Sequence, residues 1–540
     1  MDYINKILCG NDLEILPQLP AESVSCITCS PPYWGLRDYG IEPVIWDGDK
    51  DCEHEFNEYD SKLLHENRQN LDGGTLGNPQ YRKNLHGFGN AKAGFCAKCG
   101  AWRGSLGLEP TFELYIKHLC DIFDEIKRVL RKDGTCFINM GDSYWGGGQE
   151  GKFYMNKSLC DIPYRFSIEM INRGWIKRNT IIWHKPNCMP SSAPDRFTVD
   201  FEYLFFFTKN NKAIFWTNEK TLECVSKNPL GIKGIEGKDW EWQKKDSSWQ
   251  RPSRDETFKL PSRQKSTYTK EGYKKVSLWT GHDYWFDQQF DDIAEATIKR
   301  AKYNWCSPRT KSFNHPSGLN RNEPYKNHIN FSQGRNKRCV WIIPTQPFPE
   351  AHFAVYPEGL IEIPIKAGCP EFICKKCGKA RVRMLETEQE INEWNEEYFY
   401  KLLLGNSHSN RHYKTALGIM RKWMVENNCY NYETFYNWYL TQKQGTWESG
   451  NLEVGQANKL SGMLPFPRPE KRLNIKTRGY TDCGCNAGWE SGINLDPFMG
   501  TGTTALVALK QRKRFIGIEI KQEYIDMSYK RIANVQQNIF

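Results

Sequence analysis

Hydrophobic positions in the first part of the chain fall into short runs that alternate with longer stripes of helical spacing. Short apolar runs predict buried strands at 4–9, 24–29, 135–140, 175–183 and 200–207. Apolar stripes predict helices at 110–130 and 162–172, and a shorter helix at 13–19. Strands and helices that alternate in this way are typical of an α/β fold with a mainly parallel sheet covered on both faces.

Two prolines close the strand predicted at 24–29, in the sequence Ser30-Pro31-Pro32-Tyr33. Prolines end a strand, and α/β enzymes place their chemistry at the carboxyl edge of the sheet. Because proline has no amide hydrogen, carbonyls in this turn are free to accept hydrogen bonds. Ser30 adds another acceptor and Tyr33 offers an aromatic face. This set suits the exocyclic amine of a stacked base, and a turn that only closes a strand is the alternative.

A glycine turn near the carboxyl end follows another predicted strand. It lies in the stretch 494–504 and precedes a helix at 505–510 and a strand at 514–519 that ends in Glu519. A strand, a glycine turn, a helix and an acidic residue after the next strand form a nucleotide-binding type of βαβ unit. The acidic residue of such a unit binds ribose hydroxyls. A last helix is predicted at 523–535.

Together, these two motifs resemble those of the β-class S-adenosylmethionine-dependent DNA amino-methyltransferases. These are the N4-cytosine and N6-adenine modification methylases of phages, prophages and restriction-modification systems, and in the β class the catalytic motif precedes the cofactor motif. The resemblance implies a circularly permuted, Rossmann-like, seven-stranded methyltransferase sheet, with zinc-ribbon insertions and a basic target-recognition segment. It implies that the catalytic residues are Ser30, Pro31, Pro32 and Tyr33. It also implies that S-adenosylmethionine is bound by Asp12, Asp496, Phe498, Gly500, Gly502, Thr503, Thr504 and Glu519.

Asp12 has two interpretations. In the resembled family an acidic residue at the end of this strand lies near the adenine of the methyl donor, and Asp12 matches that position. Aspartate is also favoured as a helix N-cap, so Asp12 could begin the helix predicted at 13–19. The two roles are compatible.

The first residue of the catalytic motif bears on the base that is methylated. Serine at position 30 resembles the N4-cytosine enzymes more than the N6-adenine enzymes, although either side chain can accept from either amine. We therefore expect a site-specific methyltransferase acting on N4 of cytosine in double-stranded DNA, with N6-adenine methylation by the same mechanism as the alternative. A third interpretation is a non-catalytic, zinc-containing DNA-binding protein on a methyltransferase fold. Such enzymes can have a companion restriction nuclease, and the sequence predicts no oligomeric state.

Cysteines gather in two groups with the spacing of metal ligands. Of the 19 cysteines, Cys96 and Cys99 form a Cys-x-x-Cys pair that is preceded by Cys52 and His54, which predicts a zinc ribbon at about 50–105. A redox Cys-x-x-Cys pair is the alternative, but it would leave Cys52 and His54 unexplained. The second group predicts an all-cysteine zinc site and comprises Cys374, Cys377, Cys483 and Cys485. We thus expect two structural zinc ions.

Positive charge is concentrated in the middle of the chain. The net charge is +10, and residues 208–339 alone carry 26 Lys and Arg against 15 Asp and Glu, an excess of 11. This segment, in which tryptophans are interleaved with the cations, is our candidate for the basic target-recognition region that docks a polyanion. A solvated basic face, with the tryptophans as the core of a small domain, is the alternative.

These features divide the chain into four parts. Residues 1–207 form the catalytic half with the zinc ribbon, 208–339 the target-recognition region, and 340–373 with 486–540 the cofactor-binding half. Residues 374–485 form a zinc-knuckle and helical insertion. We expect its segment 379–480 to bind DNA or a partner. The sequence has no apolar run that could span a bilayer and no signal-peptide core, so we expect a cytoplasmic protein of a bacterial or phage-infected cell, without a membrane partner.

Overall fold

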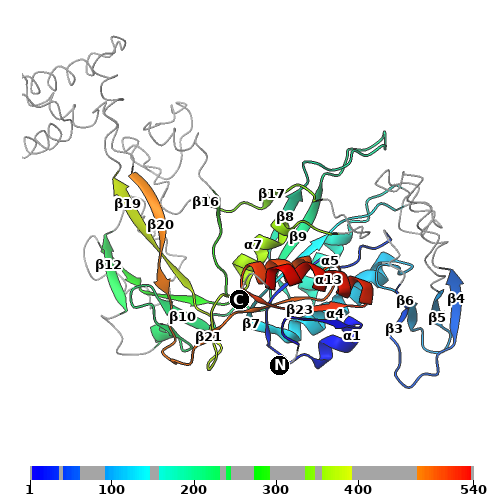
Figure 1. The fold of residues 1–540 in the computed structure, drawn as a ribbon, viewed down its shortest axis with the longest axis horizontal. Helices are drawn as coiled ribbons and strands as arrows, with labels where there is room; N and C mark the ends of the chain where they lie inside the picture. The colour runs from blue at the N-terminus through cyan, green and yellow to red at the C-terminus, as the bar shows by residue number, and fades with distance from the viewer. Residues whose placement is uncertain are drawn as a thin grey trace, which may run out of the picture. The chain divides into compact units, whose positions relative to one another are not determined.

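The computed structural model describes residues 3–35, 41–60, 92–145, 157–231, 239–244, 273–291, 335–346, 355–391 and 471–536. Figure 1 shows the helices and strands of these residues. The chain divides into two compact units. The second unit comprises 290–335 and 385–476, most of which lies outside the described residues. The first unit contains the central sheet and both cysteine groups.

An eight-stranded sheet forms the centre of the first unit. Its order is β1 (Lys6–Cys9), β23 (Arg514–Glu519), β22 (Ile493–Asp496), β2 (Val24–Cys29), β7 (Leu130–Met140), β9 (Phe201–Thr208), β8 (Ile176–His184) and β17 (Val340–Ile342). Neighbouring strands are parallel except at β9, which runs antiparallel to both β7 and β8. The predicted α/β class with a mainly parallel sheet is confirmed. The sheet has one strand more than predicted, because β17 pairs in parallel with the outer side of β8.

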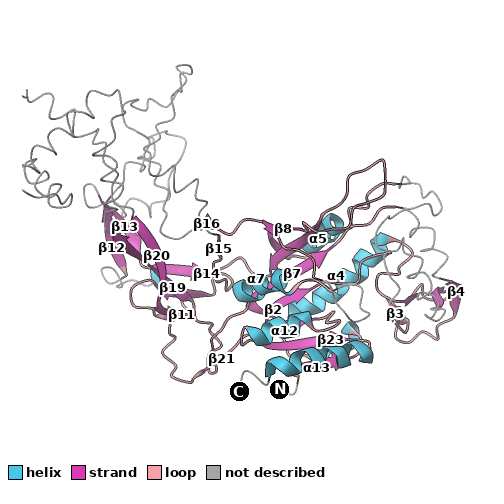
Figure 2. Cartoon of the chain, turned by 45° about the horizontal axis from the view of Figure 1, so that its top comes forward, coloured by secondary structure: helices cyan, strands magenta, loops and turns pink. Residues whose placement is uncertain are grey.

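Helices cover both faces of this sheet (Figure 2). Successive residues of β2 point to opposite faces, so that Ile27 packs in one apolar cluster and Cys26 in the other. The first cluster includes α4 (Phe112–Val129) and α5 (Ile162–Asn172), and the second includes α7 (Glu358–Gly368), α12 (Thr503–Lys510) and α13 (Gln522–Gln536). A sheet buried on both faces explains why its strands read as continuous apolar runs.

Local signals set the ends of the longest helix. Thr111 caps α4, since its side chain accepts from the backbone N–H of Leu114 at 3.3 Å, and Lys127 and Arg128 lie in the last turn near the negative end of the helix dipole. The predicted helix at 13–19 is shorter than expected: α1 (Asp12–Ile15) continues as a 3-10 turn, Leu16–Gln18. No helix in the described ranges is both long and apolar enough to cross a membrane.

Smaller sheets surround the central one. Residues 44–104 contain an antiparallel sheet of β3 (Val44–Trp46), β6 (Trp102–Gly104), β5 (Lys92–Cys96) and β4 (Phe56–Asp60). In the basic region, β10 (Phe215–Asn218) pairs with β11 (Cys224–Val225) and β14 (Trp279–His282), and β12 (Trp240–Lys244) pairs with β13 (Tyr273–Ser277). The remaining pairs are β15 (Phe290–Asp291) with β16 (Arg335–Asn336), β18 (Ile373–Cys374) with β21 (Trp489–Glu490), and β19 (Arg383–Ile391) with β20 (Lys471–Tyr480).

The described parts of the two appended regions differ in part from expectation. In the basic region, Trp279 and Trp285 are buried, as expected for a small core. The insertion 374–485 was expected to be helical between its cysteine pairs, but its described ends form the strands β19 and β20. The rest of that insertion, and residues 245–272 and 292–334 of the basic region, lie outside the described residues.

Candidate active site

The turn that follows β2 places Tyr33 at the carboxyl edge of the sheet. Its hydroxyl donates to Glu202 Oε2 at 2.8 Å, lies 3.2 Å from Asn139 Oδ1 and accepts a long hydrogen bond, 3.4 Å, from Ser30 Oγ. Burial, followed by the nearby charge of Glu202, raises the pKa of Tyr33 well above its usual value. The phenol therefore stays protonated and acts as a donor that fixes the edge of the ring.

Glu202 is itself held in place from two sides. Asn139 Nδ2 donates to its Oε2 at 3.1 Å, and Lys185 Nζ forms an ion pair with its Oε1 at 2.8 Å. Glu202 and Lys185 lie near the facing ends of β9 and β8, in the antiparallel register that pairs Glu202 with Trp183. This network restricts Tyr33 more than its place in a loop would suggest.

The Cδ2–Cε2 edge of the Tyr33 ring lies close to Gly141. A Cβ atom added to Gly141, directly after β7, would lie 2.6 Å from Tyr33 Cε2, so only glycine fits there without a shift. Tyr115 Oη donates to the Pro32 carbonyl at 2.8 Å, whereas no donor among the described residues contacts the Pro31 carbonyl. The turn therefore presents the Ser30 hydroxyl and the Pro31 carbonyl as acceptors beside an oriented ring.

Three acidic side chains meet at the same edge of the sheet. Asp12 follows β1, Asp496 ends β22 and Glu519 ends β23, and these strands are neighbours in register. Asp496 accepts from Phe498 N at 2.9 Å, and its Oδ2 from Thr504 Oγ1 at 2.6 Å. Glu519 accepts from Gly500 N at 2.8 Å. Because β22 is paired with β2, this acidic group lies one strand away from the catalytic turn.

Burial dominates the electrostatics of the acidic group. It raises the pKa of Asp496 to about 6 and also raises that of Glu519. It raises the pKa of Asp12 well above the ordinary value, with further contributions from Glu519 and Asp496. Asp12 is 8% exposed, and its Oδ1 is buried with no hydrogen-bond partner in the described part of the chain. Buried polar atoms of this kind are rare and point to a missing donor.

The proposed capping role of Asp12 is wrong. The N-cap of α1 is Asn11, whose Oδ1 accepts from Leu13 N at 3.0 Å, and Asp12 is the first helical residue. The carboxylate of Asp12 therefore does not cap the helix, and its role in binding a ligand stays a prediction.

Helix α13 braces the glycine turn between β22 and α12. Gly500 and Gly502 have φ of 53° and 79°, in the left-handed region that favours glycine, and a Cβ on Gly502 would lie 2.7 Å from Ser528 Cβ. Arg531 Nη1 donates to Thr501 O at 2.7 Å and to Thr503 Oγ1 at 3.0 Å. The turn is thus preformed, with Thr503 and Thr504 engaged inside the protein.

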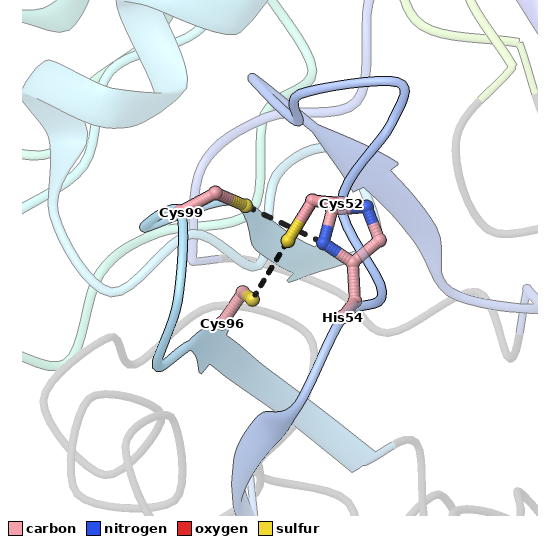
Figure 3. A group of neighbouring side chains, drawn as sticks. All are labelled: Cys52, His54, Cys96 and Cys99. Carbon is pink, nitrogen blue, oxygen red and sulfur yellow. Dashed lines mark hydrogen bonds between the residues drawn. The ribbon is translucent and has the colours of Figure 1, made fainter.

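The first cysteine group converges as its spacing indicated (Figure 3). The ligand atoms of Cys52, His54, Cys96 and Cys99 all lie within 4.8 Å of one another. Cys52 Sγ lies 4.0 Å from Cys96 Sγ, and Cys99 Sγ lies 3.4 Å from His54 Nδ1. A redox pair would not require these four side chains to meet, so the geometry favours metal binding.

The second cysteine group also converges. The sulfur atoms of Cys374, Cys377, Cys483 and Cys485 lie within 4.8 Å of one another, from two segments about a hundred residues apart in the chain. Gly378 and Gly484 have φ of 69° and 70° and allow the tight turns beside these ligands. Gly378 N donates to Cys374 O at 2.9 Å, which closes one of the turns.

Sequence reasoning missed several residues of the site. Tyr356 Oη donates to Asp496 Oδ2 at 2.9 Å, a contact that the sequence did not predict. Glu202 was interpreted only as part of a buried strand. An acidic residue within the otherwise apolar run 200–207 was a usable signal, because a carboxylate there needs a partner.

Comparisons with known proteins agree with the motifs. A family model described as DNA methylase (N6_N4_Mtase) matches residues 24–372 and 465–530. Type II methyltransferase M.XycI of Xanthomonas campestris pv. cyanopsidis is 31% identical over 225 residues, which are 38% of this chain and 55% of that protein. Type II methyltransferase M.SmaI of Serratia marcescens is 28% identical over 235 residues, which are 40% of this chain and 60% of that protein.

The matched segments thus span little more than half the length of these two relatives. Among solved structures, PvuII DNA methyltransferase (cytosine-N4-specific) aligns over 98% of this chain and 89% of its own, with 10% identity and a TM-score of 0.36. Similarity at that level carries no argument about function.

Proposed function

We propose a specific reaction for this chain, which belongs to the N6_N4_Mtase family of DNA methylases: transfer of a methyl group from S-adenosylmethionine to N4 of cytosine in double-stranded DNA. One observation carries the proposal. The acceptor turn 30–33 lies one strand away from a buried acidic group at the same edge of the sheet. The turn that would hold the amine of the base is thereby a neighbour of the acidic group that would hold the cationic methyl donor.

The acidic group fits the methyl donor. S-adenosylmethionine presents an adenine amine and ribose hydroxyls as donors, and it carries positive charge. Asp12 has a buried oxygen without a partner for such an amine, and Glu519 keeps lone pairs for ribose hydroxyls beyond the bonds it accepts from backbone. The glycine turn at 500–502 lets a ligand approach the backbone closely. Bound there, S-adenosylmethionine supplies an electrophilic methyl group on a positively charged sulfur.

The chain's own residues prepare the amine. An exocyclic amine is conjugated with its ring, so its lone pair becomes nucleophilic only as it leaves conjugation. Ser30 Oγ and the Pro31 carbonyl would accept its two hydrogens and favour that geometry in the transition state. The free face of the Tyr33 ring would stack on the base, which must first be flipped from the duplex.

No covalent intermediate is needed for this transfer. Cys29 directly precedes the catalytic turn, but it lies within β2, is fully buried, and burial raises the pKa of its thiol well above the usual value. A thiol in that state is a poor nucleophile. This supports methylation of an amine rather than of a ring carbon.

Ser30 supports cytosine as the target, and adenine N6 is the alternative by the same mechanism. The decisive experiment incubates unmethylated genomic DNA with isotopically labelled S-adenosylmethionine and analyses the digested nucleosides by mass spectrometry. Labelled N4-methylcytosine is the expected product. Labelled N6-methyladenine would keep the reaction and overturn the assignment of the base. Retention of DNA without any label would favour a non-catalytic DNA-binding protein.

We also propose that each cysteine group binds one structural zinc ion. Tetrahedral zinc with sulfur at about 2.3 Å places neighbouring ligand atoms about 3.8 Å apart, and Cys52 Sγ and Cys96 Sγ lie 4.0 Å apart. Four ligands would close each site, which is typical of structural zinc. The zinc ion of the second site would hold the two ends of the insertion 374–485 together. The insertion would then begin and end at neighbouring positions.

The order of strands supports a circularly permuted methyltransferase sheet. β2 carries the catalytic turn and β22 the start of the cofactor turn, and the two lie side by side although Thr28 and Asn494, which share a 2.9 Å hydrogen bond, are 466 positions apart. The basic region 208–339 lies between the two halves in the chain. Its excess of cations supports a role in binding the DNA duplex.

A further inference from the structure

The connection between β8 and β9, residues 185–200, leaves the sheet at the edge that carries the proposed chemistry. β8 runs antiparallel to β9, as β7 does, so β8 ends at the same edge as β7 and β2. At its first residue, Lys185 Nζ contacts Glu202 at 2.8 Å, and Glu202 accepts from Tyr33 at 2.8 Å. The base of this loop is therefore two contacts away from the catalytic ring, and Figure 1 shows the connection extending away from the sheet.

Prolines and hydrogen bonds restrict this long loop. It contains three prolines, at positions 186, 190 and 194, which stiffen it. Asn187 and Thr345 exchange two hydrogen bonds, at 3.1 and 2.8 Å. Nearer the tip, Ser191 N donates to Thr198 Oγ1 at 3.1 Å, which ties one side of the loop to the other.

Large apolar side chains of this loop are exposed to solvent. Phe197 is 95% exposed, Met189 65% and Val199 47%. An aromatic ring that is almost fully exposed contributes nothing to the core, so folding does not explain its presence. Outside the loop, Ile342 and Val340 on β17 and Ile168 on α5 are the described apolar residues whose exposure is closest to that of Met189, and none approaches Phe197.

The neighbours of Phe197 have the chemistry of a nucleic-acid contact. Arg196 stacks over the ring of Tyr144 with 3.8 Å to the centroid, and Tyr144 belongs to the segment that begins at Gly141, against which Tyr33 packs. Lys157 reaches the loop through an ion pair with Asp195 at 2.8 Å. Cations beside an exposed apolar side chain suit a duplex, whose phosphates lie outside its base stack.

We propose that loop 185–200 inserts Phe197 into the duplex, where the ring fills the gap left in the base stack by the flipped target base. This inference rests on the proposed function, because only a reaction on an extruded base leaves such a gap. Side chains such as phenylalanine wedge between bases in other proteins that deform DNA. The occupant of this apolar surface is thus the base stack next to the target, and Phe197 is a positioning residue.

The test separates extrusion of the base from the chemistry. Mapping the methylated genomic DNA identifies the recognition sequence, which is then placed in a fully paired duplex and in one with an abasic site opposite the target base. Phe197→Ala should lower kcat/KM about 10-fold or more on the paired duplex and less than about threefold on the abasic duplex, because the unpaired base is extruded at little cost. Phe197→Leu should restore most of the activity on the paired duplex.

Controls make each outcome informative. Ile168→Ala removes an apolar side chain that is 59% exposed and should leave kcat/KM unchanged on both duplexes. The Kd for S-adenosylmethionine should not change in any variant. Equal losses on the two substrates, or no loss with Phe197→Ala, would overturn the wedge. Failure of the wild-type protein to methylate either substrate would instead refute the proposed function.

Discussion

Gly141→Ala is a direct test of the placement of Tyr33. The added Cβ would lie 2.6 Å from Tyr33 Cε2 and 3.0 Å from Cδ2, whereas ordinary contact begins at 3.4 Å. The ring edge must therefore retreat by 0.8 Å to reach ordinary contact. Gly141 has no positive φ that alanine would strain, so the effect comes from the contact alone. The ring cannot yield freely because its hydroxyl is bound to Glu202 at 2.8 Å.

The expected cost follows from this geometry. Overpacking of this kind typically costs about 1–3 kcal/mol, divided between lower stability and displacement of the ring. A misplacement of about 1 Å at a reacting centre can lower the rate about 100-fold. We expect kcat for DNA methylation to fall between about 10-fold and 100-fold. The Kd for S-adenosylmethionine should stay within about twofold, since Gly141 touches none of the acidic residues.

Steady-state methylation and isothermal titration calorimetry measure these two quantities. The matched control is Gly231→Ala, because no atom of the described residues lies within 4 Å of the added Cβ and the φ of Gly231 is not positive, so kcat at saturating DNA and the Kd for S-adenosylmethionine should remain at wild-type values. In a Tyr33→Ala background, Gly141→Ala should have little further effect. Wild-type kcat in Gly141→Ala would refute the argument that the position of this ring limits catalysis.

Four further outcomes follow from the site. Ser30→Ala should lower kcat about 100-fold and leave the Kd for S-adenosylmethionine nearly unchanged, since one acceptor of the amine is lost; full turnover would exclude this role. Burial raises the pKa of Asp496 to about 6 and that of Asp12 well above its usual value. Because the deprotonated carboxylates attract the cationic donor, its affinity should rise about 10-fold between pH 5 and 7.5. The rise should be smaller in Asp496→Asn, and calorimetry measures both. In the unliganded protein the sign is opposite: because the folded-state pKa of Asp496 lies above the unfolded value, the free energy of unfolding should fall as pH rises from about 4 to 6. Mass spectrometry of the metal content should find two zinc ions per chain, and one after either Cys52→Ser or Cys374→Ser; fewer than two in the wild type would eliminate one site.

Features that depend on adjacent residues were predictable from the sequence. The strand that ends in two prolines and the glycine turn after β22 each carry their signal within about ten residues. The cysteine groups were predictable for a different reason. Ligand identity and spacing within each pair are local, and the metal chemistry itself requires the distant pairs to meet.

Features that depend on strand pairing were not predictable. Asn139 and Glu202 contact each other because β7 and β9 pair antiparallel in a register that sets Asn139 opposite Leu204. A shift of one residue would turn these side chains to the other face of the sheet, and no local pattern specifies that register. The N-cap shows the same limit at a smaller scale, since Asn11 and Asp12 are both good caps and only the backbone conformation selects Asn11.

The arrangement of the sheet explains why large insertions are compatible with one active site. The acceptor turn and the acidic group depend on the pairing of β2, β22, β23 and β1, which the insertions do not interrupt. Strands β3, β4, β5 and β6 form their own antiparallel sheet, and the second cysteine group brings together the two ends of a segment of about a hundred residues. Each insertion therefore leaves the catalytic unit at one point, and its length has little effect on strand register. Under the proposed function, the turn that would accept the amine and the acidic group that would accept the methyl donor remain one strand spacing apart, about 4.8 Å, whatever the insertions contribute to DNA binding.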